Sequence, residues 1–149
     1  MIALSDEIKK RLAGALTDGH PVVVAYVNTD GNPFLSFYGS VHAYSDSQLA
    51  LWSRNPNAEI LEAIRKKPQV GLIYGDLSSR TYCWMYGRAA TTSDEETRRK
   101  IFDGMHELER ERDSERGGVA VLIELDSVHG NGSDGPFSMK RENAMKRAS

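Results

Sequence analysis

The stretch RTYCWMYGRAA, residues 80–90, predicts a β-strand with two contrasting faces. Side chains alternate between the two faces of a strand, so the stretch divides into two sets. One set is small or apolar and suits the interior of a tight barrel: Thr81, Cys83, Met85, Gly87 and Ala89. The other set is large and partly aromatic: Arg80, Tyr82, Trp84, Tyr86 and Arg88. The strand therefore needs a partner on its second face as well as a core on its first.

Two partners could cover the aromatic face of this strand. A helix of the same chain is one possibility. A second copy of the protein is the other, because Tyr, Trp and Arg are enriched in protein–protein interfaces. An apolar surface of this size is seldom left in water, so we expect one of the two.

Five further strands are predicted along the chain. They are rich in β-branched and aromatic residues and are bounded by turn residues: 22–27, 34 to about 44, 49–53, 69–75 and 117–125. Most follow one another in hairpin order, and repeated strand–helix–strand units are missing. The pattern predicts a mainly β protein with short helices, built on a six-stranded antiparallel sheet or barrel.

Helices are predicted over residues 5–18, over a segment ending near Lys67, and after Ser93. Ser5 is the expected N-cap of the first, and Ser93 with Glu96 forms a capping box for the last. A Gly-, Ser- and Lys-rich tail begins at Asn131 and is expected to be ordered only if it docks. We expect one domain over residues 1–130 and a tail over 131–149.

The bulk composition narrows the class of protein. The chain has 149 residues, 27% charged and 40% hydrophobic, which is typical of one globular domain. A net charge of −2 gives no reason to expect nucleic acid as a partner. No apolar run approaches the length of a membrane span or a signal segment, so we expect a cytoplasmic protein without a membrane partner.

The segment SRNPNAEI, residues 53–60, joins a predicted strand to a predicted helix. The first N–H groups of a helix have no partner within the helix and attract anions. Arg54 stands beside them. The segment is therefore a candidate phosphate site, although a surface arginine at the start of a helix is the alternative.

Polar side chains share one face of the predicted strand 34–44. The face carries Phe34, Ser36, Tyr38, Ser40 and His42. It could line a ligand groove or simply face solvent. The four histidines share no metal-ligand spacing, so no metal site is expected, and no motif for covalent catalysis or nucleotide binding is found.

The order of elements resembles the pyridoxamine 5'-phosphate oxidase-like, FMN-binding split-barrel family. The resemblance covers roughly residues 5–129 and rests on these segments in this order: VVVAYVNTDGNPFLSF, LALWSRN, ILEAIRKKPQVGLI and GRAATTSDEE. It implies a homodimeric split barrel over residues 1–130, with FMN in grooves between the subunits. The implied cofactor-binding residues are Ser36, Phe37, Tyr38, Ser53, Arg54, Asn57, Tyr82 and Trp84. Tyr82 falls where the family places a residue of the other subunit beside the flavin ring.

The chain departs from the family at the phosphate. The family's arginine on the second strand falls at Ser36, and its Ser-Arg-Lys run falls at Ala58, Glu59 and Ile60. Of the positions aligned with the family's phosphate ligands, only that of Arg54 carries a full positive charge. Each charged hydrogen bond to a phosphate is worth roughly 1.5–3 kcal/mol, so the loss of two should weaken FMN markedly.

The resemblance implies an FMN-binding, oxidoreductase-like protein whose substrate and catalytic residues the sequence does not name. Two alternatives remain open. The fold could hold another ligand, such as a deazaflavin coenzyme or haem. It could also be a non-enzymatic flavin carrier or a stress-related protein.

Overall fold

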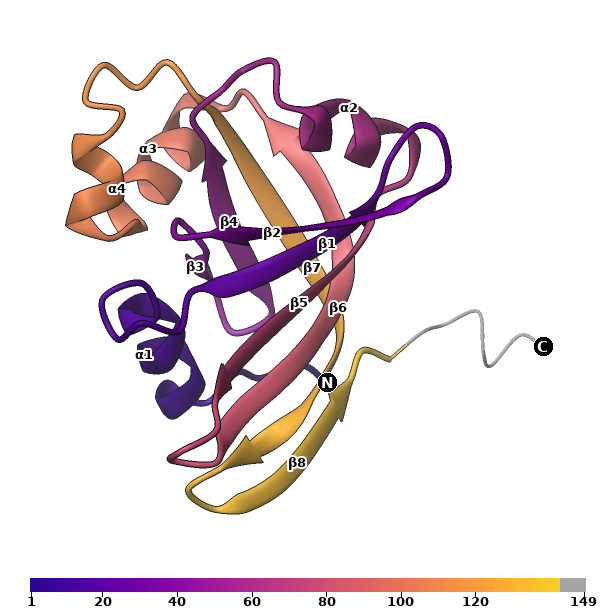
Figure 1. Ribbon diagram of the computed structural model, residues 1–149, viewed down its shortest axis with the longest axis vertical. Coiled ribbons are helices and arrows are strands. Elements are labelled where there is room, and N and C mark those ends of the chain that lie inside the picture. The colour runs from indigo at the N-terminus through magenta and orange to yellow at the C-terminus, as the bar shows by residue number, and fades with distance from the viewer. Residues whose placement is uncertain (143–149) are drawn as a thin grey trace.

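The computed structural model describes residues 1–142 and confirms a mainly β protein with short helices (Figure 1). The helices of this part are α1 (Asp6–Gly14), α2 (Glu59–Lys66), α3 (Glu95–Gly104) and α4 (Glu107–Glu111). Its strands are β1 (Val22–Val27), β2 (Pro33–Tyr38), β3 (His42–Ala43), β4 (Gln48–Ser53), β5 (Gln69–Asp76), β6 (Thr81–Thr92), β7 (Val119–Gly132) and β8 (Gly135–Lys140). The expected number of strands, six, is wrong, because the described chain forms eight.

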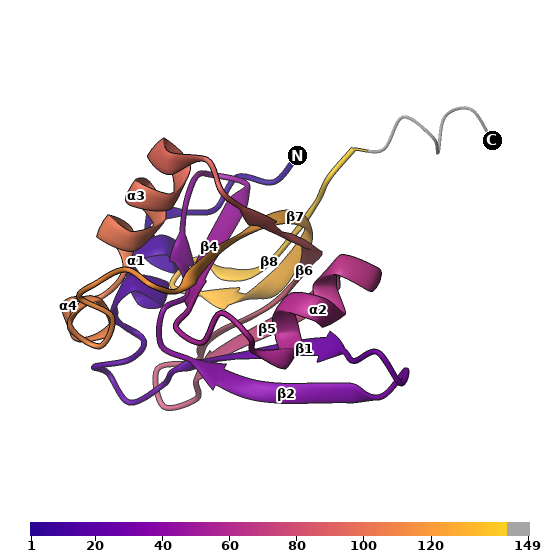
Figure 2. The same cartoon turned by 90° about the horizontal axis from the view of Figure 1, so that it is seen from above.

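All strands belong to one antiparallel sheet with the order β2-β1-β5-β6-β7-β4-β3, and β8 pairs with β7. The sheet curls into an open barrel, with α2 on one side and α1, α3 and α4 gathered on the other (Figure 2). The long strands β6 and β7 form its spine. Short loops join most neighbouring strands, as the hairpin order predicts.

The long strand expected over 34–44 is interrupted. β2 ends at Tyr38, and the chain crosses the open side of the barrel to pair again as β3 with β4. Ser40 makes this crossing stable, because its hydroxyl donates to the Trp52 carbonyl (3.1 Å) and accepts from the Trp52 N–H (3.0 Å). A side chain thus replaces the ladder bonds that a continuous strand would make.

The inward set of β6 lies in the core, as predicted. Cys83 and Met85 are fully buried and Ala89 is nearly so, packed against the inner residues of neighbouring strands such as Leu72 and Ile123. β6 begins only at Thr81. Arg80 instead occupies the left-handed region (φ 55°) in the preceding turn, so it is not part of the aromatic face.

The outward set of β6 continues across three more strands. Two rows of cross-strand neighbours join β2, β1, β5 and β6: Phe37, Val23, Ile73 and Trp84 in one, and Leu35, Ala25, Gly71 and Tyr86 in the other. We call these eight residues the outer face. Its large members are exposed, with 72% of Leu35, 69% of Phe37, 41% of Ile73, 42% of Trp84 and 49% of Tyr86 open to solvent.

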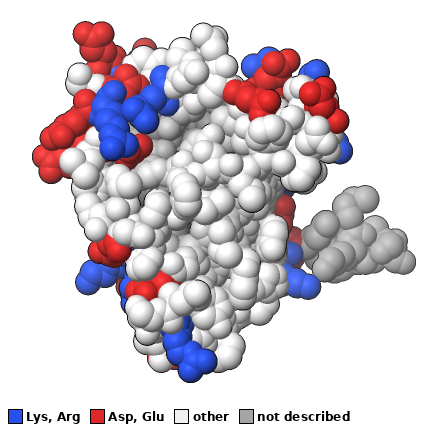
Figure 3. Space-filling model, viewed as in Figure 1, with Lys and Arg blue, Asp and Glu red and all other residues white. Residues whose placement is uncertain are grey.

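The outer face is uncovered within residues 1–142, so the interpretation that a helix of the same chain covers it is wrong for this part of the chain. Figure 3 shows a broad uncharged area over β1, β2 and β5, with charged side chains confined mainly to its margins. At one margin of this area, Arg88 on β6 forms an ion pair with Asp126 on β7 (3.1 Å) and is not part of the outer face. A face this large and apolar fits an interface better than solvent.

The predicted helix ends are correct in one case and displaced in the other. Ser5 caps α1, and its hydroxyl accepts from the Ile8 N–H (3.2 Å). α3 is capped by Asp94, which accepts from the Thr97 N–H (3.0 Å), so the capping box of Ser93 and Glu96 is wrong by one residue. Asp94 is the N-cap in place of Ser93 because an ionised carboxylate is a stronger hydrogen-bond acceptor than a hydroxyl at a helix N-terminus.

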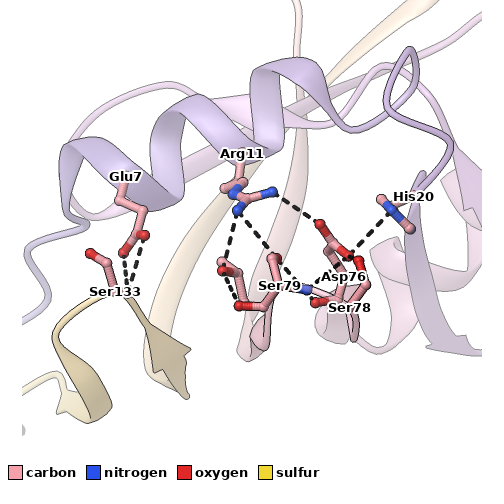
Figure 4. A network of polar contacts seen from close by, with 8 residues as sticks. Glu7, Arg11, His20, Asp76, Ser78, Ser79 and Ser133 are labelled. Atoms are coloured by element: carbon pink, nitrogen blue, oxygen red, sulfur yellow. Dashed lines mark hydrogen bonds and ion pairs between the residues drawn. The ribbon is translucent and has the colours of Figure 1, made fainter.

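The tail expected from Asn131 is partly built into the sheet. β7 runs to Gly132, and β8 returns along it to Lys140, so the boundary placed after residue 130 falls inside a strand. Glu7 of α1 accepts from the Ser133 N–H with both carboxylate oxygens (3.1 Å each), which holds the hairpin turn (Figure 4). The remainder of the expected tail, residues 143–149, lies outside the described residues.

A second polar network joins α1 to the turn between β5 and β6 (Figure 4). Arg11 pairs with Asp76 (3.2 Å), and its guanidinium also reaches Ser79 (3.2 Å). The Ser78 hydroxyl donates to Asp76 (2.8 Å), and His20 lies 3.6 Å from the same carboxylate. The hydrogen bonds from Ser78 and Ser79 lower the pKa of Asp76 from 3.8 to about 2.

This network makes part of the stability depend on pH. A carboxyl group with a lowered pKa stabilises the fold above its unfolded pKa, and that stabilisation is lost as pH falls through its folded pKa. We therefore expect Asp76→Asn to lower the free energy of unfolding at pH 7, and the gap to the unaltered protein to close between about pH 4 and pH 2. Urea unfolding at several pH values measures this. Asp134→Asn, in the exposed β7–β8 turn, is the control; a gap that stays constant with pH would contradict the assignment.

Candidate functional site

A cavity of about 650 Å³ opens where the ends of β2 and β4 meet α4. This volume lies in the range of small-molecule sites, roughly 300–1,000 Å³. Its lining mixes aromatic, hydroxyl and charged side chains: Leu16, Pro21, Phe37, Tyr38, Gly39, Ser40, Trp52, Ser53, Arg54, Asn55, Glu109 and Arg112. The break in the expected strand 34–44 creates this opening, because Gly39 and Ser40 lie on the crossing segment between β2 and β3.

Five of the eight residues predicted to bind the cofactor lie at or beside this cavity. Phe37, Tyr38, Ser53 and Arg54 line it, and Ser36 precedes Phe37 on the edge strand β2. Ser53 is buried at the end of β4, and Arg54 is exposed at the start of the turn that follows. Phe37 also takes part in the outer face, so the cavity and that face meet along β2.

The other three predicted residues lie elsewhere. Asn57 is exposed in the turn before α2, outside the cavity lining. Tyr82 and Trp84 lie on β6 with their rings 5.4 Å apart at a steep angle, also outside the lining. A single subunit therefore does not bring Tyr82 and Trp84 together with Arg54.

The turn from Ser53 to Ala58 uses most of its own donors. The Asn57 N–H donates to the Asn55 side chain (2.9 Å), and the Ala58 N–H donates to the Asn55 carbonyl (3.1 Å). The Ser53 hydroxyl donates to that same carbonyl (2.9 Å). In this conformation the N–H groups of Asn57 and Ala58 are therefore not free to donate to a phosphate.

The positions of the family's Ser-Arg-Lys run serve other purposes here. Ile60 is 1% exposed and belongs to the hydrophobic core, so a lysine at this position would be buried. Glu59 is exposed, and its carboxylate accepts from the Tyr26 hydroxyl (2.8 Å). Burial and then this carboxylate raise the pKa of Tyr26, which keeps the hydroxyl protonated as a donor. The start of α2 is thus tied to β1 and presents an acid instead of a base.

The wall of the cavity opposite β2 comes from α4, which the sequence did not single out. Glu109 is 6% exposed, and its carboxylate pairs with Arg112 (2.9 Å). A Cβ atom on Gly39 would lie 3.2 Å from the Glu109 carboxylate, so α4 packs directly on the end of β2. No local motif marks Glu109 or Arg112, since only the tertiary fold places them beside Ser53 and Arg54.

The loop after α4 is held in place by Asp113. Its carboxylate accepts from the Trp52 indole (2.7 Å) and from the N–H groups of Gly117 (3.0 Å) and Gly118 (2.8 Å). Burial alone would raise the pKa of Asp113, but these hydrogen bonds and the nearby charge of Arg54 lower it below its usual value. Arg54 lines the same cavity as Glu109 and Arg112.

Residues 1–142 contain neither a metal-binding cluster nor a helix suited to crossing a membrane. No group of three or more His, Cys, Asp and Glu side chains there could hold a metal ion. In the same part of the chain, no helix combines the length and the apolar character that crossing a bilayer requires. Cys83 is a buried free thiol whose pKa burial raises to about 12, which makes it a packing residue and not a nucleophile.

No protein-family model and no curated protein matches the chain. Solved structures do match. HupZ of Group A Streptococcus is 13% identical, with a TM-score of 0.66 over 90% of this chain and 98% of that one. General stress protein 26 of Bacillus anthracis is 16% identical, with a TM-score of 0.65 over 91% and 99%.

A third structure, from Clostridium acetobutylicum, is described as related to general stress protein 26 and as a member of the pyridoxinephosphate oxidase family. It is 12% identical, with a TM-score of 0.63 over 89% of this chain and 95% of that one. The fold is therefore that of the split-barrel proteins. This is the fold that the resemblance to the pyridoxamine 5'-phosphate oxidase-like proteins implied.

Proposed function

We propose that the protein is an FMN-binding split-barrel homodimer of the oxidoreductase-like group. The observation that carries this proposal is the cavity that places Ser53 and Arg54 beside the aromatic residues Phe37 and Tyr38. A cation with neighbouring hydroxyl groups suits a phosphate, and flat aromatic side chains suit a flavin ring. The volume lies in the range of small-molecule sites, and the Arg54 guanidinium supplies the charged donor that a phosphate needs.

The homodimer completes the site in this proposal. The outer face adjoins the cavity along β2, and its aromatic and apolar composition is that of an interface core. Tyr82 and Trp84 of one subunit would then reach the ligand that Arg54 of the other subunit holds. Bound flavin supplies the redox chemistry, while the protein positions the ring and excludes water.

The residues of the chain divide the work as follows. Arg54 donates to the phosphate. The Ser53 hydroxyl, which donates to the Asn55 carbonyl in the structure, would have to turn to donate to the phosphate as well. Tyr38 is half-buried beside the cavity, and burial raises its pKa, so its hydroxyl stays protonated and can donate to a ligand. No acid or base is assigned to the reaction itself.

Replacing Arg54 by alanine tests the phosphate end of this site. We expect FMN to bind about 10- to 100-fold more weakly, because a charged hydrogen bond is worth roughly 1.5–3 kcal/mol. Riboflavin lacks the phosphate and should lose little affinity. Fluorescence titration of both flavins measures the difference, and equal affinity of the unaltered protein for FMN and riboflavin would rule out a phosphate site.

Turnover then separates the enzyme from a carrier. A purified sample with bound flavin should be yellow, and reduction by NAD(P)H or a reduced deazaflavin under anaerobic conditions would establish oxidoreductase activity. Flavin binding without reduction by any donor would favour the carrier. A colourless sample that binds neither flavin would remove the proposal.

A further inference from the structure

The start of α2 lacks the cation that the resemblance implies there, and an arginine at the end of α4 lies in the same cavity as Arg54. In the turn before α2, the N–H groups of Asn57 and Ala58 are already bonded to Asn55, and the nearest charge on the helix is the carboxylate of Glu59. The first N–H groups of α2 have no side-chain cap, but an anion at this helix end would meet the Glu59 carboxylate and no cation of the helix. The start of α2 is therefore a poor phosphate site.

The α4 wall offers the opposite charge. Arg112 lines the same cavity as Arg54, and about half of its side chain (52%) remains exposed. Asp113 follows Arg112 in the sequence. Arg54 lies close enough to Asp113 to contribute to the lowering of its pKa. Two guanidinium groups from distant parts of the sequence thus face one opening.

Neither arginine is fully neutralised by the carboxylate nearest to it. Glu109 is buried and accepts from only one guanidinium nitrogen of Arg112, at 2.9 Å. The oxygens of Asp113 are already shared among the Trp52 indole and two backbone N–H groups. Arginine presents five N–H donors, so both guanidinium groups keep donors available for an anion.

We propose that the phosphate monoester of the ligand binds between Arg54 and Arg112, on the α4 side of the cavity and not at the start of α2. The inference rests on the proposed function for the identity of the ligand, but the anion site itself stands on the two arginines. Glu109 positions Arg112 and also lowers the net positive charge of the site. Its removal therefore has the opposite effect to the removal of either arginine.

The test compares FMN and riboflavin affinities across four variants of the full-length protein. Arg112→Ala and Arg54→Ala should each weaken FMN about 10- to 100-fold and leave riboflavin nearly unchanged. Glu109→Gln keeps an acceptor for Arg112 but removes the carboxylate charge, so it should tighten FMN several-fold. Arg99→Ala, on the exposed side of α3, is the matched control and should change neither affinity.

A second measurement keeps the anion site testable without flavin. Inorganic pyrophosphate at millimolar concentration should raise the melting temperature of the unaltered protein and of Arg99→Ala, but not that of Arg54→Ala or Arg112→Ala. If neither flavin binds while this pattern holds, the flavin proposal fails and the anion site remains. FMN affinity unchanged by Arg112→Ala, or pyrophosphate stabilisation retained in it, overturns the site.

Discussion

Replacing Trp84 by glutamate should convert the proposed dimer into a monomer. Trp84 lies in the outer face, in one row with Phe37 and Ile73, and the residue is 42% exposed in the isolated subunit. Trp is enriched among the residues that dominate interface energies. A glutamate there would bury an unpaired charge on association, at a cost of about 3–5 kcal/mol per site. The dimer dissociation constant should rise by at least about a hundredfold, as sedimentation velocity at micromolar concentration would measure.

Leu77→Glu is the matched control for this substitution. Leu77 is 79% exposed in the turn between β5 and β6, outside the outer face, so a charge there should leave the dimer intact. FMN affinity should fall in Trp84→Glu together with dimerisation, since the proposed site takes residues from both subunits. A monomeric unaltered protein, or a Trp84→Glu variant that remains a dimer, would show that the outer face is not the interface.

The parts of the fold that follow from local patterns were predictable from the sequence. The alternation of residues 81–89 correctly divided β6 between core and surface, with Cys83 and Met85 fully buried and Trp84 and Tyr86 exposed. Period-two alternation is reliable here because one face must be apolar and small for the barrel to close. The same local chemistry placed Ser5 as the cap of α1.

The parts that failed depend on contacts between distant residues. The break after Tyr38 is stabilised by the two hydrogen bonds between Ser40 and Trp52, which no local pattern reveals. β8 is short and begins with Gly and Pro, which are depleted in strands, and it becomes a strand because β7 offers it a free edge. Tertiary pairing overrides local propensity in such segments.

In the candidate site too, some residues follow from local sequence patterns and others only from contacts between distant residues. Ser53 and Arg54 could be placed at the end of a strand from the sequence, and the structure puts them in a cavity. Glu109 and Arg112 could not be found this way, because a charged run in a short helix is usually a solvated surface. Only the packing of α4 against Gly39 brings them to the opening.

Replacing Gly130 by alanine should destabilise the fold more than any surface change considered above. Gly130 pairs with Cys83 across β6 and β7, and a Cβ atom on it would lie 2.1 Å from the Tyr82 carbonyl oxygen and 2.8 Å from the Cys83 Cβ. The first of these neighbours is backbone, and Cys83 is fully buried, so neither can move without separating the strands. Overpacking of this kind costs about 1–3 kcal/mol and sometimes more, out of a total stability of about 5–15 kcal/mol.

We expect a loss of about 3 kcal/mol in the free energy of unfolding, measured by urea denaturation. Gly75→Ala is the control, because Gly75 pairs with Tyr82 from the other side and a Cβ atom there meets nothing within 4 Å. Its stability should stay within about 0.5 kcal/mol of the unaltered protein. A Gly130→Ala variant as stable as this control would contradict the close approach of β6 and β7.

The strand displacement that we expect would also move Tyr82, so flavin affinity should fall in the folded fraction of Gly130→Ala and stay unchanged in Gly75→Ala.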